Sequence, residues 1–380
     1  MLVPYRCWAD VDLAALRENL AWLRHRVGAG VRILTVVKAD AYGHGLKPIA
    51  ALLMQSGTDV FGVANLGEAQ TIRAVGAGWP ILMLGACLPQ EVSLAVRDQV
   101  MPTLSSLEEA QQFSSAALRQ KVVVRAHLKV DTGMGRLGVG VTEAEELAVR
   151  LHALPGLQLE GLFTHYAAAE DDPEFTAAQA AQFSRLVERL HARGVRLPTI
   201  HANNSAALLH APSTLFNLVR PGLLVYGVSP PGPRRPAAAW PDHLKPALSW
   251  HCRVSLVKRV ARGTSLSYGR SFVAPRAMRV ATLTAGYGDG YARAGSNRAW
   301  VLIGGRRCRI VGRITMDQML ADVTRVPAVK PGDPVVLIGR QGEDQITAAD
   351  LAAWGDTVPW EVLTNISYRV PRIYRGAQAA

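Results

Sequence analysis

The chain has 380 residues, of which 49% are hydrophobic and 19% are charged, a globular composition with enough length for two or three domains. Its formal net charge of +12 would suit a nucleic-acid partner, but the arginines are spread along the chain and do not form a run with interleaved aromatic residues. We therefore expect an ordinary basic surface, with no nucleic-acid partner and no membrane partner.

The cysteines and the N-terminal residues indicate the cellular compartment. Arg6 interrupts the N-terminal stretch "MLVPYRCWADVD" too early for the apolar core of a signal peptide, and no long uncharged apolar segment follows. The cysteines are far apart and have no metal-type spacing, so we expect free thiols, no metal site and a cytoplasmic protein. They are Cys7, Cys87, Cys252 and Cys308.

The first elements are a short extended piece and a helix. Asp12 is predicted to cap this helix, whose apolar residues recur at helical spacing. These residues are Leu13, Leu16, Leu20 and Leu23.

Eight apolar, strand-like runs follow, and most gaps between them hold an amphipathic helical pattern, clearest at 142–154 and 177–194. Eight strand–helix units in succession predict an α/β fold, a (β/α)8 TIM barrel. A long open doubly wound sheet is the structural alternative. The runs are 32–38, 59–64, 80–85, 99–104, 121–130, 157–165, 198–204 and 216–222.

A proline-rich stretch at 229–246, "SPPGPRRPAAAWPDHLKP", ends this rhythm. Beyond it, short alternating runs separated by glycine turns predict a mostly antiparallel β C-terminal domain. We expect the barrel over residues 1–240 and the β domain over 241–380. The first few residues of the chain are candidates to pair with the C-terminal domain.

Lys38 stands at the end of the first apolar run and precedes a turn of small residues, "ADAYGHG". A buried, unpaired ammonium is costly, whereas a lysine that forms a Schiff base replaces its free amine by an imine. A lysine that only caps a strand at the surface is the alternative from this context.

Polar residues follow several other predicted strands, where the functional groups of a barrel gather. Ser205 lies near a predicted helix N-terminus, and Gly222 would let a phosphate approach the backbone closely. A phosphate site and a Schiff-base lysine together indicate pyridoxal 5'-phosphate (PLP). The polar residues at these strand ends are Lys129, Asp131, Arg136, His165, His201, Asn204, Ser205 and Arg220.

Nine segments in order make the chain resemble the alanine racemase family. The resemblance runs from about Trp8 to Arg375, and it implies a barrel with a β domain, PLP as cofactor, and a homodimer with shared active sites. The implied activity is interconversion of L- and D-alanine, which supplies D-alanine for peptidoglycan. The segments are "VVKADAYGHG", "KVDTGMGRLGV", "THYAAAE", "HANNSAA", "VRPGLLVYG", "LSYGR", "GYGDGY", "VGRITMDQ" and "VPWEVLTNISYRVPRIYR".

The resemblance also implies residue roles. Lys38 would hold PLP and act as one catalytic base, and Tyr268 of the partner subunit would be the other. Arg136 and the backbone N–H of Met316 would bind the substrate carboxylate, and Arg220 would face the pyridine nitrogen of the cofactor. The further cofactor-binding positions are Tyr42, Arg136, His165, His201, Asn204, Ser205 and Gly222, the supporting ones are Asp317, Tyr287 and Trp360, and Lys129 would be the carbamylated lysine.

Two positions depart from the family pattern. Trp360 replaces a tyrosine that the family usually has, so one hydroxyl contact to the phosphate is missing, and Gly288 stands where alanine is common. Besides alanine racemase, the sequence leaves open a serine or broad-specificity racemase, a barrel-type PLP decarboxylase and a non-catalytic PLP-binding protein. The segments containing Tyr268 and Met316 argue against the decarboxylase.

Overall fold

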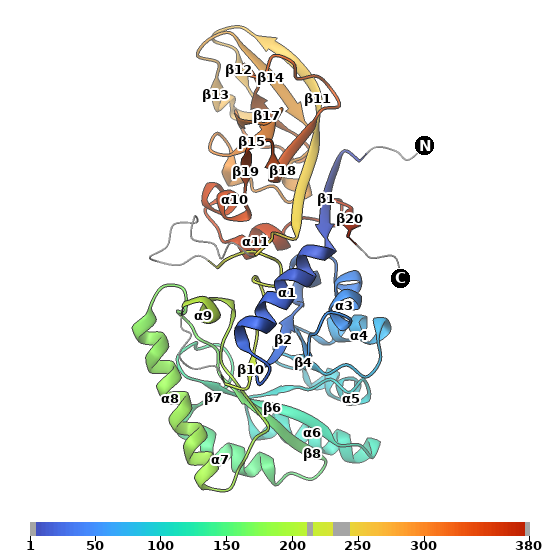
Figure 1. The fold of residues 1–380 in the computed structure, drawn as a ribbon, viewed down its shortest axis with the longest axis vertical. Helices are drawn as coiled ribbons and strands as arrows, with labels where there is room; N and C mark the ends of the chain where they lie inside the picture. The colour runs from blue at the N-terminus through green and yellow to red at the C-terminus, as the bar shows by residue number, and fades with distance from the viewer. Residues whose placement is uncertain (1–4, 211–215, 231–243, 377–380) are drawn as a thin grey trace. The chain divides into compact units, whose positions relative to one another are not determined.

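The computed structural model describes residues 5–210, 216–230 and 244–376, and the chain forms two compact units (Figure 1). The barrel unit comprises Arg17–Ala41 and Gly45–Leu244. The β unit comprises Met1–Leu16, Tyr42–His44 and Lys245–Ala380. Most of the proline-rich stretch, residues 231–243, lies outside the described residues.

Parallel strands close into a barrel in the barrel unit. The first and last strands pair, with Leu218 opposite Arg32, and the gap before the fourth strand is closed by a parallel bridge between Leu82 and Met101. An open doubly wound sheet is therefore excluded, and the predicted TIM barrel is confirmed. In barrel order the strands are β2 (Arg32–Val36), β3 (Val60–Val63), β4 (Ile81–Met83), β5 (Thr103–Leu104), β6 (Val124–Asp131), β8 (Leu157–Phe163), β9 (Thr199–His201) and β10 (Leu218–Val219), with β7 (Val139–Gly140) paired to β6.

Helices connect these strands, as parallel pairing requires. The predicted Asp12 cap is confirmed, because its carboxylate accepts the backbone N–H groups of Ala14 at 2.9 Å and Ala15 at 3.0 Å. The second clear helical pattern begins four residues early, at Pro173, since Asp172 caps that helix. The helices are α1 (Leu13–Val27), α3 (Leu46–Met54), α4 (Leu66–Val75), η1 (Pro89–Glu91), α5 (Val92–Arg97), α6 (Leu107–Gln120), α7 (Val141–His152), α8 (Pro173–Ala192) and α9 (Ser205–His210).

The β unit is built on a mostly antiparallel sheet, as predicted. Its long strand β11 (Leu248–Val260) alternates buried and more exposed residues over its first half, so one face packs into the core. Strand β1 (Cys7–Asp12) lies between β11, to which it is antiparallel, and β20 (Arg372–Arg375), to which it is parallel. The N-terminal segment thus completes the interior of the sheet.

Most of the other strands of the β unit extend this sheet, the first two of them form a separate two-stranded sheet, and short helices join them. The strands are β12 (Ser265–Leu266), β13 (Phe272–Val273), β14 (Met278–Leu283), β15 (Trp300–Ile303), β16 (Arg306–Arg309), β17 (Met319–Asp322), β18 (Pro334–Gln341) and β19 (Asp344–Ile346). The helices are η2 (Tyr268–Arg270), η3 (Tyr287–Asp289), η4 (Arg293–Gly295), α10 (Ala348–Gly355) and α11 (Pro359–Thr364).

All four cysteines are free thiols, as predicted, and three of them are buried. Among the helices that the structure describes, none has the length and apolar character needed to cross a bilayer.

Candidate active site

The turn that carries Lys38 has an unusual backbone. Strand β2 ends at Val36, and the four residues 39–42, none of them glycine, have φ between 53° and 54°. The left-handed region costs an L-residue about 1–2 kcal/mol, so this turn needs support from its surroundings. Glu68 supplies part of it by accepting the backbone N–H groups of Ala39 and Ala64, each at 2.7 Å.

Two lysines of the barrel unit, Lys38 and Lys129, have nearby cations that affect their pKa. Burial, followed by the nearby Arg136, lowers the pKa of Lys38, while Glu68 opposes the shift. Burial also lowers the pKa of Lys129 to about 7, with Arg220 as the next cause. Both lysines therefore lose their protons more easily than lysines in water do.

Arg220 is a buried cation, 3% exposed, on the segment that follows β10. Its guanidinium donates to the carbonyl oxygens of Thr164 at 2.8 Å and Ala202 at 2.7 Å, and to Nδ1 of His201 at 2.8 Å and of His165 at 3.2 Å. Burial lowers the pKa of Arg220 to about 9. All four acceptors are neutral groups, and no carboxylate pairs with this guanidinium in the described part of the chain.

The two predicted histidines are held neutral beside this cation. Burial is the main cause that lowers the pKa of both His165 and His201 well below its ordinary value, and Arg220 is the next. A neutral imidazole accepts a hydrogen bond through one nitrogen and donates through the other. The structure thus brings His165, His201 and Arg220 into one hydrogen-bonded cluster.

Sequence reasoning missed two members of this cluster, His127 and Phe163. Nδ1 of His127 lies 2.8 Å from Nε2 of His201, and the Phe163 ring stacks on His201 with centroids 4.6 Å apart. The Lys129 Nζ also lies 5.3 Å from the Phe163 ring centre. Residues two apart on a strand share a face, so the spacing of His127 and Lys129 on β6 was the available signal.

Two residues predicted to bind a phosphate also lie close together. The Ser205 hydroxyl accepts the backbone N–H of Gly222 at 2.9 Å. Asn204 instead caps the following helix, since its Oδ1 accepts the Ala207 N–H at 2.9 Å. Its neighbour Asn203 is fully buried, and within the described residues neither polar atom of its side chain has a hydrogen-bond partner. That amide is therefore available to a ligand.

Asp131 organises the loop that leads to Arg136. Its carboxylate accepts three backbone N–H groups, from Gly133 at 2.9 Å, Met134 at 2.8 Å and Gly135 at 2.9 Å. This agrees with the turn-forming role that "DTG" indicates.

The other predicted site residues belong to the β unit. Tyr268 is 71% exposed on η2, Tyr287 and Met316 are also exposed, and Tyr42 is buried. Asp317 pairs with Arg369 at 2.7 Å. Trp360 lies half-buried in α11.

The loops that carry Tyr287 and Met316 are joined by backbone hydrogen bonds. The Gly288 N–H donates to the Met316 carbonyl at 2.8 Å, and the Tyr287 N–H donates to Thr315 at 2.9 Å. A Cβ at Gly288 would lie 2.4 Å from the Arg369 guanidinium, so an alanine there would force that side chain to move. Within the described residues, the Met316 N–H makes no hydrogen bond.

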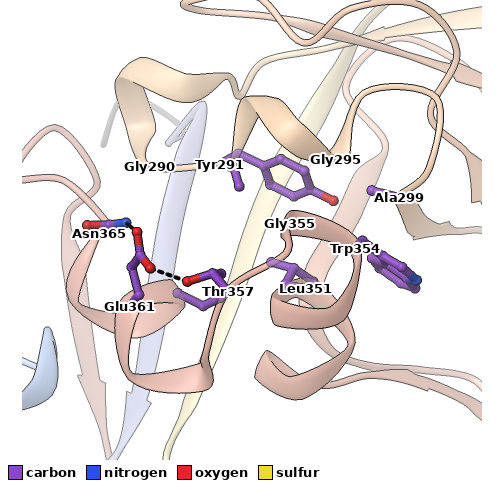
Figure 2. Close-up of a pocket in the computed structure, with 12 residues that line it drawn as sticks. Gly290, Tyr291, Gly295, Ala299, Leu351, Trp354, Gly355, Thr357, Glu361 and Asn365 are labelled. Carbon is purple, nitrogen blue, oxygen red and sulfur yellow. Dashed lines mark hydrogen bonds between the residues drawn. The ribbon is translucent and has the colours of Figure 1, made fainter.

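The β unit also contains a cavity of about 70 Å³, and none of the residues that line it is a predicted site residue. Figure 2 shows these lining residues. The buried Tyr291 hydroxyl lies at its wall and has no hydrogen-bond partner in the described structure. Across the cavity, Thr357 donates to Glu361, which also accepts from Asn365 at 3.4 Å. The cavity is enclosed by η4, α10 and α11.

Comparisons with known proteins agree with the two units. Residues 11–230 match the family model of the alanine racemase N-terminal domain, and residues 247–374 match that of the C-terminal domain. The alanine racemase of Symbiobacterium thermophilum is 43% identical over 373 residues, which is 98% of each chain.

Solved structures of similar fold include two with informative ligands. An alanine racemase from Bacillus anthracis with bound L-Ala-P has a TM-score of 0.89 and 34% identity, covering 99% of this chain and 97% of its own. One from Bartonella henselae with covalently bound pyridoxal phosphate has a TM-score of 0.87 and 29% identity, covering 98% of this chain and 100% of its own.

Proposed function

The chain belongs to the alanine racemase family, and on that premise we propose that it is a PLP-dependent enzyme that interconverts L- and D-alanine. The observation that carries the proposal is the cationic mouth of the barrel. There the easily deprotonated Lys38 lies among Arg136, Lys129 and a buried Arg220, which pairs with no carboxylate in the described ranges. Such a mouth suits an anionic cofactor and an anionic substrate group.

The residues present fit PLP. Lys38 would hold it covalently, and Ser205, Gly222 and Tyr42 would hold its phosphate. The Asn203 amide, whose polar atoms have no hydrogen-bond partner within the described residues, offers hydrogen-bonding groups that a bound ligand could use. Bound PLP supplies an electron sink that acidifies the Cα–H of an attached amino acid.

Arg220 would determine how strongly the cofactor withdraws electrons from Cα. A guanidinium is a permanent donor, so facing the pyridine nitrogen it would keep that nitrogen unprotonated. A weaker sink favours rapid return of the proton to Cα over transamination. The neutral His165, whose Nδ1 lies 3.2 Å from Arg220, would link it to the second base.

Two bases on opposite faces of Cα would invert the stereocentre. We assign Lys38 to one face and Tyr268 of the partner subunit in a homodimer to the other. The 71% exposure of Tyr268 supports this assignment, because a base that works in another subunit must project from its own. Arg136 and the free N–H of Met316 would fix the substrate carboxylate between them.

Lys129 is suited to carbamylation. Its pKa of about 7 leaves much of the amine neutral, and a neutral amine adds CO2 to form a carbamate with release of one proton. The carbamate would be an anion among Arg136 and Arg220, and it would orient the Arg136 guanidinium.

The wider role we propose is supply of D-alanine for peptidoglycan in the cytoplasm. A serine or broader racemase is the second candidate, since Gly288, whose N–H donates to Met316, and Trp360 in α11 both depart from the family pattern. The match of residues 247–374 to the racemase C-terminal domain disfavours a PLP decarboxylase and a PLP-binding protein without catalysis.

The test is racemisation of L- and D-alanine, serine and lysine by the purified protein with added PLP. Alanine should be converted fastest, and the protein should absorb at roughly 420 nm, as enzymes that hold PLP on a lysine do. Lys38→Ala should lose both the band and the activity. A protein that stays colourless and inactive after incubation with PLP contradicts the proposal.

A further inference from the structure

Two buried histidines and Arg220 form a chain of hydrogen bonds whose direction is fixed. Nη1 of Arg220 lies 2.8 Å from Nδ1 of His201, and Nε2 of His201 lies 2.8 Å from Nδ1 of His127. A guanidinium has only donors, so Nδ1 of His201 must accept. The proton of neutral His201 is then on Nε2, and His127 accepts it through an unprotonated Nδ1.

The His127 ring occupies a space that the neighbouring strand leaves open. His127 stands opposite Gly161 in the parallel ladder between β6 and β8. A Cβ at Gly161 would lie 2.4 Å from Nδ1 of His127, so any larger residue would displace the ring. On the other side of the cluster, Phe163 stacks on His201 at an interplanar angle of 5°.

We propose that His127 is a positioning residue that holds the His201 ring by accepting its Nε2–H and, through that ring, orients the Arg220 guanidinium. Without an acceptor at this position, the buried Nε2–H of His201 would be unsatisfied. A ring that turned toward another acceptor would withdraw its Nδ1 from Arg220. The inferred effect on racemisation rests on the proposed function, whereas the effect on the His201 ring does not.

Two variants separate this role from simple packing. His127→Asn keeps a hydrogen-bond acceptor near the position of Nδ1, because the amide oxygen of asparagine occupies a similar place. His127→Leu fills the space without an acceptor. His152→Leu, at an exposed position of α7, is the matched control.

The first measurement is nitrogen NMR of histidine-labelled protein without PLP. In the wild type, His201 should show a protonated Nε2 and an unprotonated Nδ1 that accepts from Arg220. His127→Asn should keep these signals, and His127→Leu should shift the Nδ1 signal as the ring moves away from Arg220. If the Nδ1 signal of His201 is unchanged in His127→Leu, the proposal is wrong.

The second measurement is racemisation by the PLP-loaded enzyme. His127→Leu should lower kcat about tenfold, the equivalent of one hydrogen bond, with little change in KM. His127→Asn should stay within about threefold of the wild type on the same scale. Equal kcat in the wild type and in His127→Leu would overturn the proposal, while inactivity of the wild type itself would count only against the proposed function.

Gly161→Ala provides a route if His127→Leu does not fold. It leaves His127 chemically intact and presses on its ring from the opposite strand. The Nδ1 signal of His201 should again shift in the PLP-free protein, and an unchanged nitrogen spectrum would refute the proposal.

Discussion

Replacing Lys129 by methionine should change how the free energy of unfolding depends on pH. The folded structure lowers the pKa of this lysine from 10.5 to about 7, first through burial and then through Arg220. Below pH 7 the amine is protonated in both the folded and the unfolded state, so the folded state carries the full cost of a buried charge. Above pH 7 the unfolded state alone keeps the proton, and stability rises with pH.

The size of the effect follows from one proton. The free energy of unfolding gains about 1.4 kcal/mol per pH unit while only the unfolded state is protonated. Between about pH 7 and about pH 9, the wild type should therefore gain about 2.7 kcal/mol that Lys129→Met does not gain. Lys129→Met should be the more stable protein at the acidic end, because it buries no charge.

Urea unfolding of the PLP-free protein in CO2-free buffer, from about pH 6 to about pH 9, measures this difference. Lys47→Met, at an exposed lysine, is the control and should follow the wild type. Added bicarbonate should stabilise the wild type but not Lys129→Met, since only the wild type can form the carbamate. Parallel curves for the wild type and Lys129→Met over the whole range would refute the reasoning.

Three further substitutions test other parts of the molecule. Tyr268→Phe should slow racemisation by about 10²-fold or more in both directions, while the Cα proton of one enantiomer still exchanges with D2O, and equal exchange from both enantiomers would remove Tyr268 from its proposed role. Glu68→Ala should lower the free energy of unfolding in urea by about 1–3 kcal/mol, because two backbone N–H groups lose their acceptor. It should also lower the pKa of Lys38 further. An unchanged unfolding midpoint would show that the left-handed turn is stable without Glu68. Tyr291→Phe should leave stability unchanged or raise it by about 1 kcal/mol, because the hydroxyl that it removes has no partner among the residues that the structure describes. A clear loss would show that the cavity in Figure 2 holds a hydrogen-bonding occupant.

The barrel could be predicted from the sequence because its signals are local. Each strand is a short apolar run, and each helix has its own apolar spacing and cap. The order of the elements determines which strand ends lie at the same end of the barrel. That logic alone brought Arg220, His165 and His201 together, and the structure shows them in hydrogen-bond contact.

Other features depend on contacts between distant residues, and local patterns do not encode them. The His127 ring fits only because the residue opposite it on β8, Gly161, has no side chain. The left-handed turn after Lys38 contains no glycine to reveal it, and it depends on Glu68 from α4. Asn204 and Asn203 are adjacent and chemically identical, and only the helix geometry decides that the first is a cap.

The position of β1 inside the β sheet has a consequence for synthesis on the ribosome. The strand on one side of it, β11, follows roughly 240 residues later, about 12–50 s at ordinary translation rates. The strand on its other side, β20, is made later still. The nascent polypeptide must therefore keep β1, whose Cys7, Ala9 and Val11 are buried in the folded protein, unpaired throughout that interval, which is when a holdase chaperone would matter most.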